Sequence, residues 1–249
     1  AGVNATVLCY GQSGCGKTFS MTGPPRVRGK TEGPFADIWL FQDSVGILPR
    51  ACRHLFRFAR TEAEGKGASF EITASNIEIY NEEVRDLLAP NTKRPALRVR
   101  ETPTAGVYVE NVKESKVSTT EELLHVLYRG DRNRQASESN PSRFSGRAHT
   151  LFTVNVVRTG HDMVRRVGRL SFADLGGSET AVHAAGRRGA HLPEQKRVNK
   201  SLCALTSCIL ALSSKQEATT AAAKARSPPQ TPKSSAAAAD LHVPFRDSK

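Results

Sequence analysis

The feature that most constrains this chain is a glycine-rich stretch at residues 11–18, which consists of Gly11, Gln12, Ser13, Gly14, Cys15, Gly16, Lys17 and Thr18. It follows a short apolar run at 6–10 that is typical of a buried strand, and a segment capable of forming a helix comes next. Glycines at these spacings let backbone N–H groups converge on phosphate oxygens. Lys17 can reach the β- and γ-phosphates, and the Thr18 hydroxyl can bind Mg²⁺. The stretch therefore predicts a nucleotide site, in preference to a glycine-rich turn without a ligand.

Length and charge point to one large α/β domain that binds an acidic partner. A chain of 249 residues can bury a sizeable core, and its net charge of +12 favours nucleic acid, an anionic membrane or an acidic protein surface. The five cysteines form no Cys-x-x-Cys pair, and Cys15 lies inside the phosphate loop. We therefore expect a reducing, intracellular setting. No apolar run approaches membrane-spanning length. The chain opens without Met almost directly on the phosphate-loop strand, so an N-terminal part is expected to be missing.

Hydrophobic periodicity predicts alternating helices and strands along the rest of the chain. Helices are expected at 16–22, 46–56, 81–88, 119–128 and 196–212, and β segments at 70–79, 97–112, 150–158 and 167–174. The alternation slips by one residue between Ala74 and Ile77, which predicts a β-bulge. Residues 64–67 read as a turn, and Gly130 is expected to end its helix. Thr119 and Glu122 have the spacing of a capping box.

A second phosphate-sensing element is predicted where the strand at 167–174 ends. Asp174 closes that strand and is followed by Gly176, Gly177 and Glu179. An acid in this place can order Mg²⁺ through water, and the N–H of an unobstructed glycine can meet a γ-phosphate. A strand followed by Asp is weak evidence alone, and it gains value here because the same chain carries the phosphate loop.

The helix expected at 196–212 has an apolar face and a polar face. Val198, Leu202, Leu205, Ile209 and Leu212 share one side, while Lys196, Asn199, Lys200 and Ser207 lie opposite. For a single helix, a solvated surface is a commoner explanation of such a polar face than a binding face. Residues 213–240 are rich in Ala, Ser, Thr, Pro and Lys, and this composition predicts a disordered, low-complexity basic segment.

The order of these motifs resembles the kinesin motor domain over essentially all 249 residues. Residues 11–18 resemble its phosphate loop, 77–88 a segment specific to the family, and 174–179 its second switch, where the family usually has Ala at Gly176. Residues 198–202 resemble its relay helix, and 242–249 the next microtubule-contacting helix. The resemblance implies a P-loop NTPase three-layer α/β sandwich, with a central mixed, mostly parallel sheet and helices on both faces. It also implies an incomplete motor domain at 1–249, with 213–240 as a loop insertion, and without the family's first strand, adenine-contacting motif, final strand, last helix and neck.

The first switch departs from the family pattern Asn-x-x-Ser-Ser-Arg-Ser-His. The corresponding positions here are Ser142, Ser145, Gly146, Arg147, Ala148 and His149. Gly146 replaces the serine that would meet Mg²⁺ and the γ-phosphate. On this basis we expect turnover roughly tens- to several-hundred-fold below that of an intact switch, with nucleotide binding less affected. Ser145 could substitute if the loop shifts its register.

The resemblance implies an ATP-dependent microtubule motor that uses ATP and Mg²⁺. The implied ATP-binding residues are Gly11 to Thr18, together with Phe19 beside the adenine, and Mg²⁺ is held by Thr18 and, through water, by Asp174. The implied catalytic residues are Ser145, Arg147, Asp174, Gly177 and Glu179, with Arg147 and Glu179 as a latch between the switches. The implied tubulin contacts are Lys196, Lys200, Lys215 and Arg246. Microtubules are the expected partner, without nucleic acid or membrane; a homodimer is expected through regions outside this chain, with localisation in the cytoplasm and on the cytoskeleton.

Two other interpretations stay open at this point. One is a microtubule-binding protein of the same family with little or no ATPase activity, which Gly146 favours. The other is a different P-loop NTPase that acts on nucleic acid, against which the segments 77–88 and 242–249 argue. Microtubule stimulation of ATPase tests the first, and co-sedimentation with microtubules or with DNA tests the second.

Overall fold

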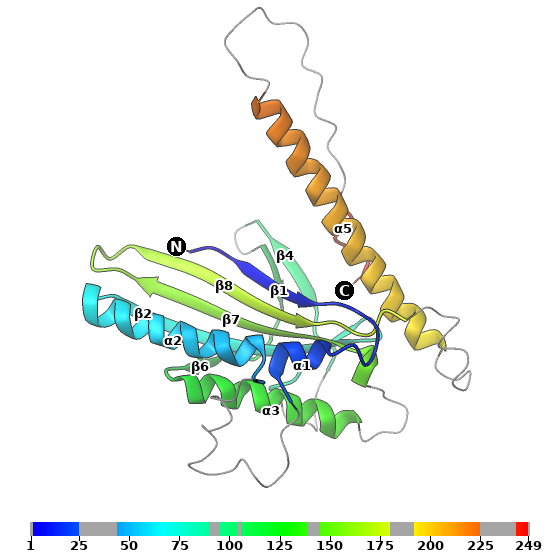
Figure 1. Ribbon diagram of the computed structural model, residues 1–249, viewed down its shortest axis with the longest axis horizontal. Helices are drawn as coiled ribbons and strands as arrows, with labels where there is room; N and C mark the ends of the chain where they lie inside the picture. The colour runs from blue at the N-terminus through cyan, green and yellow to red at the C-terminus, as the bar shows by residue number, and fades with distance from the viewer. Residues whose placement is uncertain are drawn as a thin grey trace, which may run out of the picture. The chain divides into compact units, whose positions relative to one another are not determined.

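The computed structural model describes residues 2–24, 44–89, 95–103, 106–138, 145–179, 192–224 and 243–248. The chain divides into two compact units, Ala1–Glu179 and Thr180–Lys249, and each is described by itself. The first unit holds the sheet and the phosphate loop (Figure 1). Within the described ranges, none of the helices has the length and apolar character needed to cross a membrane.

The first unit is built on a six-stranded mixed sheet with the order β1-β8-β7-β2-β3, in which β6 also pairs with β2. Its strands are β1 (Ala5–Cys9), β2 (Ser69–Tyr80), β3 (Glu83–Asp86), β6 (Ser115–Val117), β7 (His149–Thr159) and β8 (Arg165–Asp174). Of the described pairs only β1–β8 is parallel. The prediction of a mostly parallel sheet is therefore wrong for these strands, because short hairpin turns join β2 to β3 and β7 to β8 and make each pair antiparallel.

The strand β2 is the long spine of this sheet. It pairs with β7 without interruption from Ser69 opposite Thr159 to Ile79 opposite His149, so the predicted bulge is wrong. The apolar phase slips because residues 74–78 are all buried and both faces of the strand are covered there. The apolar alternation of the segments at 150–158 and 167–174 is confirmed as the hairpin of β7 and β8.

Residues 81–88 do not form the predicted helix. They turn back on β2 as β3, with Ile77 opposite Asp86 and Tyr80 opposite Glu83. Asn81 and Glu82 occupy the turn with φ of 59° and 66°. Two left-handed residues between strands match the right-handed twist of a hairpin, so the turn favours a strand where side-chain spacing alone suggested a helix.

The first strand is more exposed than the sequence suggested. β1 stands at one end of the strand order, and Leu8 is 44% exposed. Away from the main sheet, β4 (Val99–Thr102) and β5 (Gly106–Val109) form a separate two-stranded sheet, as expected around the Gly106 turn.

Three helices lie against one face of the main sheet: α1 (Lys17–Thr22), α2 (Ile47–Lys66) and α3 (Thr120–Glu138) (Figure 1). Met21, Leu48 and Leu123 meet Phe152 and Phe172 in the core between the helices and the sheet. These helices form one of the predicted helical layers.

Two helices run further than the sequence indicated. α2 continues through the predicted turn at 64–67 and ends where Gly67, in a left-handed conformation, donates its N–H to the Ala63 carbonyl. α3 passes through Gly130 and does not end there, and the absence of a side chain at this position leaves room for Asn76, whose amide lies where a Cβ would be. The Thr119 hydroxyl accepts the Glu122 N–H at 3.1 Å, which confirms the predicted helix start.

Among its described residues, the second unit contains one long helix, α5 (Leu192–Lys224). Residues 213–224 belong to this helix, so the prediction of disorder is wrong for that part of 213–240. Alanine, glutamine, glutamate and lysine in this stretch are strong helix formers. The remainder of 213–240 lies outside the described residues. Val198 and Leu202 are buried, whereas Ile209 and Leu212 at the far end of the apolar face are exposed. Arg246 lies exposed in the short segment 243–248.

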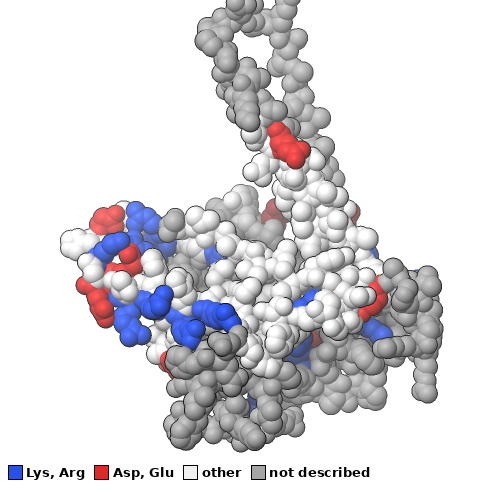
Figure 2. Space-filling view, in the orientation of Figure 1, with Lys and Arg blue, Asp and Glu red and all other residues white. Residues whose placement is uncertain are grey.

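Positive charge also gathers where the sequence did not indicate it. Figure 2 shows Lys and Arg side chains along the surface over α2. Arg53, Arg57 and Arg60 are exposed on that helix at spacings of three and four residues, so they share one side of it. The basic character of the chain is therefore not confined to the positions expected to meet a partner.

Candidate nucleotide site

The phosphate loop joins the end of β1 to the start of α1. Gly14 and Gly16 have φ of 81° and 92°, the left-handed region that L side chains rarely adopt. A Cβ at either position would meet nothing within 4 Å, so this side of the loop is open. The Lys17 Nζ donates to the Gln12 carbonyl at 3.0 Å and thus lies folded over the loop. The left-handed glycines and the helix that begins at Lys17 fit a phosphate loop at 11–18, and the ATP-binding role of these residues stays a prediction.

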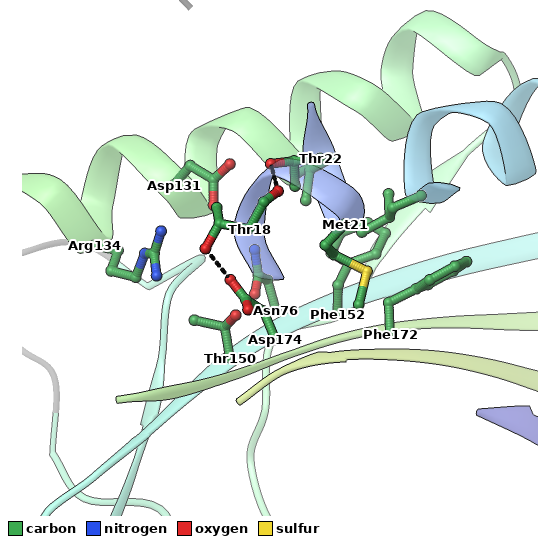
Figure 3. A pocket seen from close by; sticks show the side chains of 12 residues that line it. Thr18, Met21, Thr22, Asn76, Asp131, Arg134, Thr150, Phe152, Phe172 and Asp174 are labelled. Atoms are coloured by element: carbon green, nitrogen blue, oxygen red, sulfur yellow. Dashed lines mark hydrogen bonds between the residues drawn. The ribbon is translucent and has the colours of Figure 1, made fainter. Parts of the chain in front are cut away.

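One hydrogen bond connects the loop to the end of β8. The Thr18 hydroxyl donates to Asp174 Oδ2 at 2.5 Å (Figure 3). The parallel register places Cys9 opposite Asp174, and the Leu175 N–H donates to the Cys9 carbonyl at 3.2 Å. The two strand ends, and with them the loop and the acid, are therefore held side by side.

The residues at this junction fit a bound Mg²⁺–nucleotide. Asp174 is 9% exposed, and its Oδ1 has no hydrogen-bond partner among the described residues. A hydroxyl and a carboxylate are the hard oxygen ligands that Mg²⁺ takes, often through water. A buried carboxylate oxygen without a partner is costly unless a cation, water or donor meets it. Thr18 and Asp174 are thus the residues that would hold the metal.

A small cavity lies beside this pair on the interior side (Figure 3). Its volume is about 20 Å³, which is room for one water molecule and too little for a nucleotide. Apolar side chains line one part of it, and polar side chains the other, namely Thr18, Thr22, Asn76, Asp131, Arg134, Thr150 and Asp174. The cavity therefore lies beneath the nucleotide site and is not the site itself.

The two switch segments meet through their backbones. Ser145–Arg147 forms a short 3₁₀ turn, and the Gly146 carbonyl accepts the Gly177 N–H at 2.7 Å. The Ser178 N–H donates to the Gly11 carbonyl at 3.2 Å. The first switch, the second switch and the phosphate loop are thus joined around one point.

Glu179 is held by the phosphate loop. Its Oε1 accepts the Ser13 N–H at 2.9 Å. Burial raises the pKa of Glu179, but hydrogen bonds from the Ser13 hydroxyl and N–H, together with the charge of Lys17, outweigh burial and lower it. Pairing of Glu179 with Arg147 stays a prediction.

His149, to which the sequence assigned no role, supports the second switch. Its Nδ1 accepts the Gly176 N–H at 3.0 Å, so the proton of the neutral ring is on Nε2. Burial lowers the pKa of His149, and the nearby Glu82 carboxylate opposes that shift. Only its position at the start of a strand, opposite Ile79 of β2, brings this side chain to the switch.

Several other predicted site residues lie at the surface. Phe19 is 53% exposed on α1, and Lys196, Lys200 and Lys215 are exposed on α5. At roughly 100° per residue, these three lysines fall within about 100° of arc on the helix. The roles of Phe19, Ser145, Arg246 and the lysines stay predictions.

Comparison with known proteins decides the family. The family model of the kinesin motor domain matches residues 1–249. The chain belongs to the kinesin motor-domain family. Kinesin-like protein Klp98A of Drosophila melanogaster is 36% identical over 99% of this chain. Kinesin-related protein 5 of Dictyostelium discoideum is 32% identical over all of it, and a kinesin heavy chain of Syncephalastrum racemosum is 35% identical, also over all of it.

A solved kinesin structure agrees with the fold. It is a fast kinesin, described with implications for ATPase mechanism and interactions with microtubules; it is 33% identical and superposes over 100% of this chain with a TM-score of 0.75. The fold is therefore the P-loop NTPase fold of the kinesin motor, as the resemblance implied. This kinesin-family chain spans 59% of that solved chain and 18–22% of the three relatives named above.

Proposed function

We propose that this kinesin-family chain binds ATP with Mg²⁺, hydrolyses it, and couples hydrolysis to binding and movement along microtubules. The observation that carries the proposal is the hydrogen bond of 2.5 Å between Thr18 and Asp174, which unites the phosphate loop with the acid of the second switch. The hydrogen bonds among the first switch, the second switch and the phosphate loop lie at the same site.

Each residue of the site has a task that follows from its chemistry. Bound Mg²⁺–ATP supplies the terminal phosphoryl group that water accepts. Lys17 can exchange the Gln12 carbonyl for phosphate oxygens, and Thr18 and Asp174 would hold the metal. The Gly177 N–H bonds to Gly146 in this conformation and is the donor that can turn toward a γ-phosphate. Glu179, whose pKa is lowered, stays ionised at neutral pH.

Coupling to the microtubule is proposed for the second unit. The exposed Lys196, Lys200 and Lys215 of α5, with Arg246, suit an acidic protein surface such as that of tubulin. We place the protein on the microtubule cytoskeleton in the cytoplasm, and assign dimerisation to regions outside this chain.

The decisive experiment measures ATPase activity of the full-length protein with and without microtubules. We expect microtubules to stimulate turnover, Lys17→Ala to abolish it, and DNA to leave it unchanged. Stimulation by DNA in place of microtubules would instead identify a nucleic-acid NTPase. Co-sedimentation with microtubules but no ATP turnover would identify the binding protein that Gly146 suggested. We favour the motor, because the Thr18–Asp174 pair that would hold the metal is in place.

A further inference from the structure

A line of arginines runs along the exposed side of α2. Arg53, Arg57 and Arg60 are exposed, and at roughly 100° per residue they fall within about 60° of arc on the helix. We call these three residues the arginine stripe. Figure 2 shows Lys and Arg side chains gathered over this helix. Glu64, one turn further along, lies on the same line and ends the stripe.

The stripe is unfavourable for the helix that carries it. Residues 47–61 contain four arginines and no acidic residue. Like charges three or four residues apart on a helix repel, whereas alternating signs at these spacings stabilise it. Among the described residues, neither Arg57 nor Arg60 has a carboxylate at ion-pair distance, and Glu62 of the same helix pairs with Lys66 and Arg158 instead. The protein thus retains a repulsion that an acidic partner would remove.

The stripe differs in chemistry from the residues proposed to meet microtubules on α5. Those residues are Lys196, Lys200 and Lys215, whereas the stripe consists of arginine alone. A guanidinium is planar and can form two parallel hydrogen bonds to one carboxylate, while a strongly hydrated ammonium acts as a point charge. Arginine is also enriched, and lysine depleted, in protein–protein interfaces. The stripe therefore suits carboxylates held in place by a docked protein.

The spacing of the stripe indicates the form of that partner. Along the helix axis, Arg57 lies about 6 Å beyond Arg53, and Arg60 about 4.5 Å beyond Arg57. A second α-helix with carboxylates at i, i+4 and i+7 presents them at the same two intervals on one side. In an extended strand, residues on one face repeat every 6.6 Å or so, and the third carboxylate is already out of step with Arg60.

We propose that the arginine stripe of α2 is a docking site for an acidic α-helix of a protein partner other than tubulin, with carboxylates at i, i+4 and i+7. A second copy of this chain does not suit the role, because each copy carries a net charge of +12 and two copies repel. The proposal invokes neither nucleotide nor microtubule, so it does not rest on the proposed function.

Two synthetic peptides of about 20 residues, long enough to be helical in water, test the docking site on the full-length protein. In the first, glutamates follow the i, i+4, i+7 pattern along one side of the helix. The second has the same composition with its glutamates distributed all round. We expect the first to bind about tenfold more tightly at low salt, as measured by fluorescence anisotropy. Equal affinities, or equal affinity for poly-glutamate of the same charge, would overturn the helical partner.

Variants of the stripe separate specific recognition from overall charge. Arg57→Glu/Arg60→Glu should weaken the first peptide about tenfold or more, and Arg57→Lys/Arg60→Lys about threefold, because lysine keeps the charge and loses the two-pronged hydrogen bond. Lys196→Glu/Lys200→Glu is the matched control, with the same change of charge on α5, and should alter peptide affinity little. Equal losses from the two glutamate variants, or a lysine variant that binds like the unmodified protein, would overturn recognition by the stripe.

Phosphatidylserine vesicles, single-stranded RNA and microtubules test the other occupants of the stripe. Vesicle or RNA binding that Arg57→Glu/Arg60→Glu abolishes, with no binding of the acidic helical peptide, would overturn the protein partner in favour of that ligand. Loss of microtubule co-sedimentation in the same variant would assign the stripe to the track and overturn a separate partner. The melting temperature of this variant should not fall, because Glu at position 57 relieves the repulsion with Arg53.

Discussion

The Thr18 hydroxyl donates a 2.5 Å hydrogen bond to the Asp174 carboxylate, 156 residues away along the chain. The bond exists because β1 and β8 are parallel neighbours in register, so that the residues after both strands leave the sheet at the same edge. It makes the phosphate loop and the second switch one structural unit before any nucleotide is present.

Removing this hydroxyl should weaken the fold as well as the site. Thr18→Ala leaves a buried carboxylate without its donor, and we expect a loss of about 1–3 kcal/mol in the free energy of unfolding of nucleotide-free protein. Thr18→Ser keeps the hydroxyl and should retain most of that stability and the ATPase activity. Urea unfolding of both variants measures the difference. Equal stability of the alanine and serine variants would mean that the bond contributes nothing.

The buried imidazole of His149 should make stability depend on pH. Its pKa in the folded protein is lowered from 6.5, chiefly by burial, so the folded state favours the neutral ring. The stability from this group is therefore fully present above pH 6.5 and is lost as pH falls through the lower, folded-state pKa.

His149→Asn isolates this effect, because an asparagine oxygen can accept the Gly176 N–H and does not titrate. The measurement is the free energy of unfolding between neutral and mildly acidic pH, compared between the two proteins. The unmodified protein should lose more stability than the variant below pH 6.5. Parallel curves would show that His149 carries no such dependence.

Two helical glycines should respond oppositely to alanine. Gly65→Ala in α2 has open space around the new Cβ and should stabilise the protein by about 0.5–1 kcal/mol. Gly130→Ala in α3 forces the Asn76 side chain away, and the overpacking should outweigh the gain in helix propensity and produce a net loss. Chemical unfolding of both variants measures these changes in the free energy of unfolding. Similar gains at both sites would show that Asn76 moves at no cost.

Charge reversal on α5 tests the proposed microtubule face. We expect Lys196→Glu/Lys200→Glu to weaken microtubule binding at low salt about fivefold or more, since one close charge contact is worth about 1 kcal/mol in water. The loss should shrink as salt shortens the Debye length to about 8 Å. Arg57→Glu/Arg60→Glu on the exposed side of α2 is the matched control and should not weaken binding. Co-sedimentation across a salt series measures the microtubule affinity of both variants. Equal losses of affinity would show that overall charge, and not a contact through α5, determines binding.

Much of the site could be predicted because its signals are local. The spacing of glycines before Lys17 and Thr18 specifies the loop through backbone conformations that only glycine adopts easily. The alternation in β7 and β8 and the position of Asp174 at a strand end also belong to single segments, and a period of two is readable without knowing the partners. The order of these motifs then indicated the family.

Tertiary structure decided what depends on two distant segments. Residues 83–86 became a strand because β2 offered an open ladder beside a left-handed turn, and the glycine at position 130 leaves room for Asn76 of β2. The break in the apolar alternation of β2 reflects burial of both faces of the strand and not a bulge. The elements packed on the sheet determine which faces are buried, and the sequence of β2 alone does not specify them. Gly146 looked like a loss in the sequence. Only the folded chain shows that its carbonyl accepts the Gly177 N–H of the second switch, because contacts between residues 31 positions apart leave no trace in local pattern.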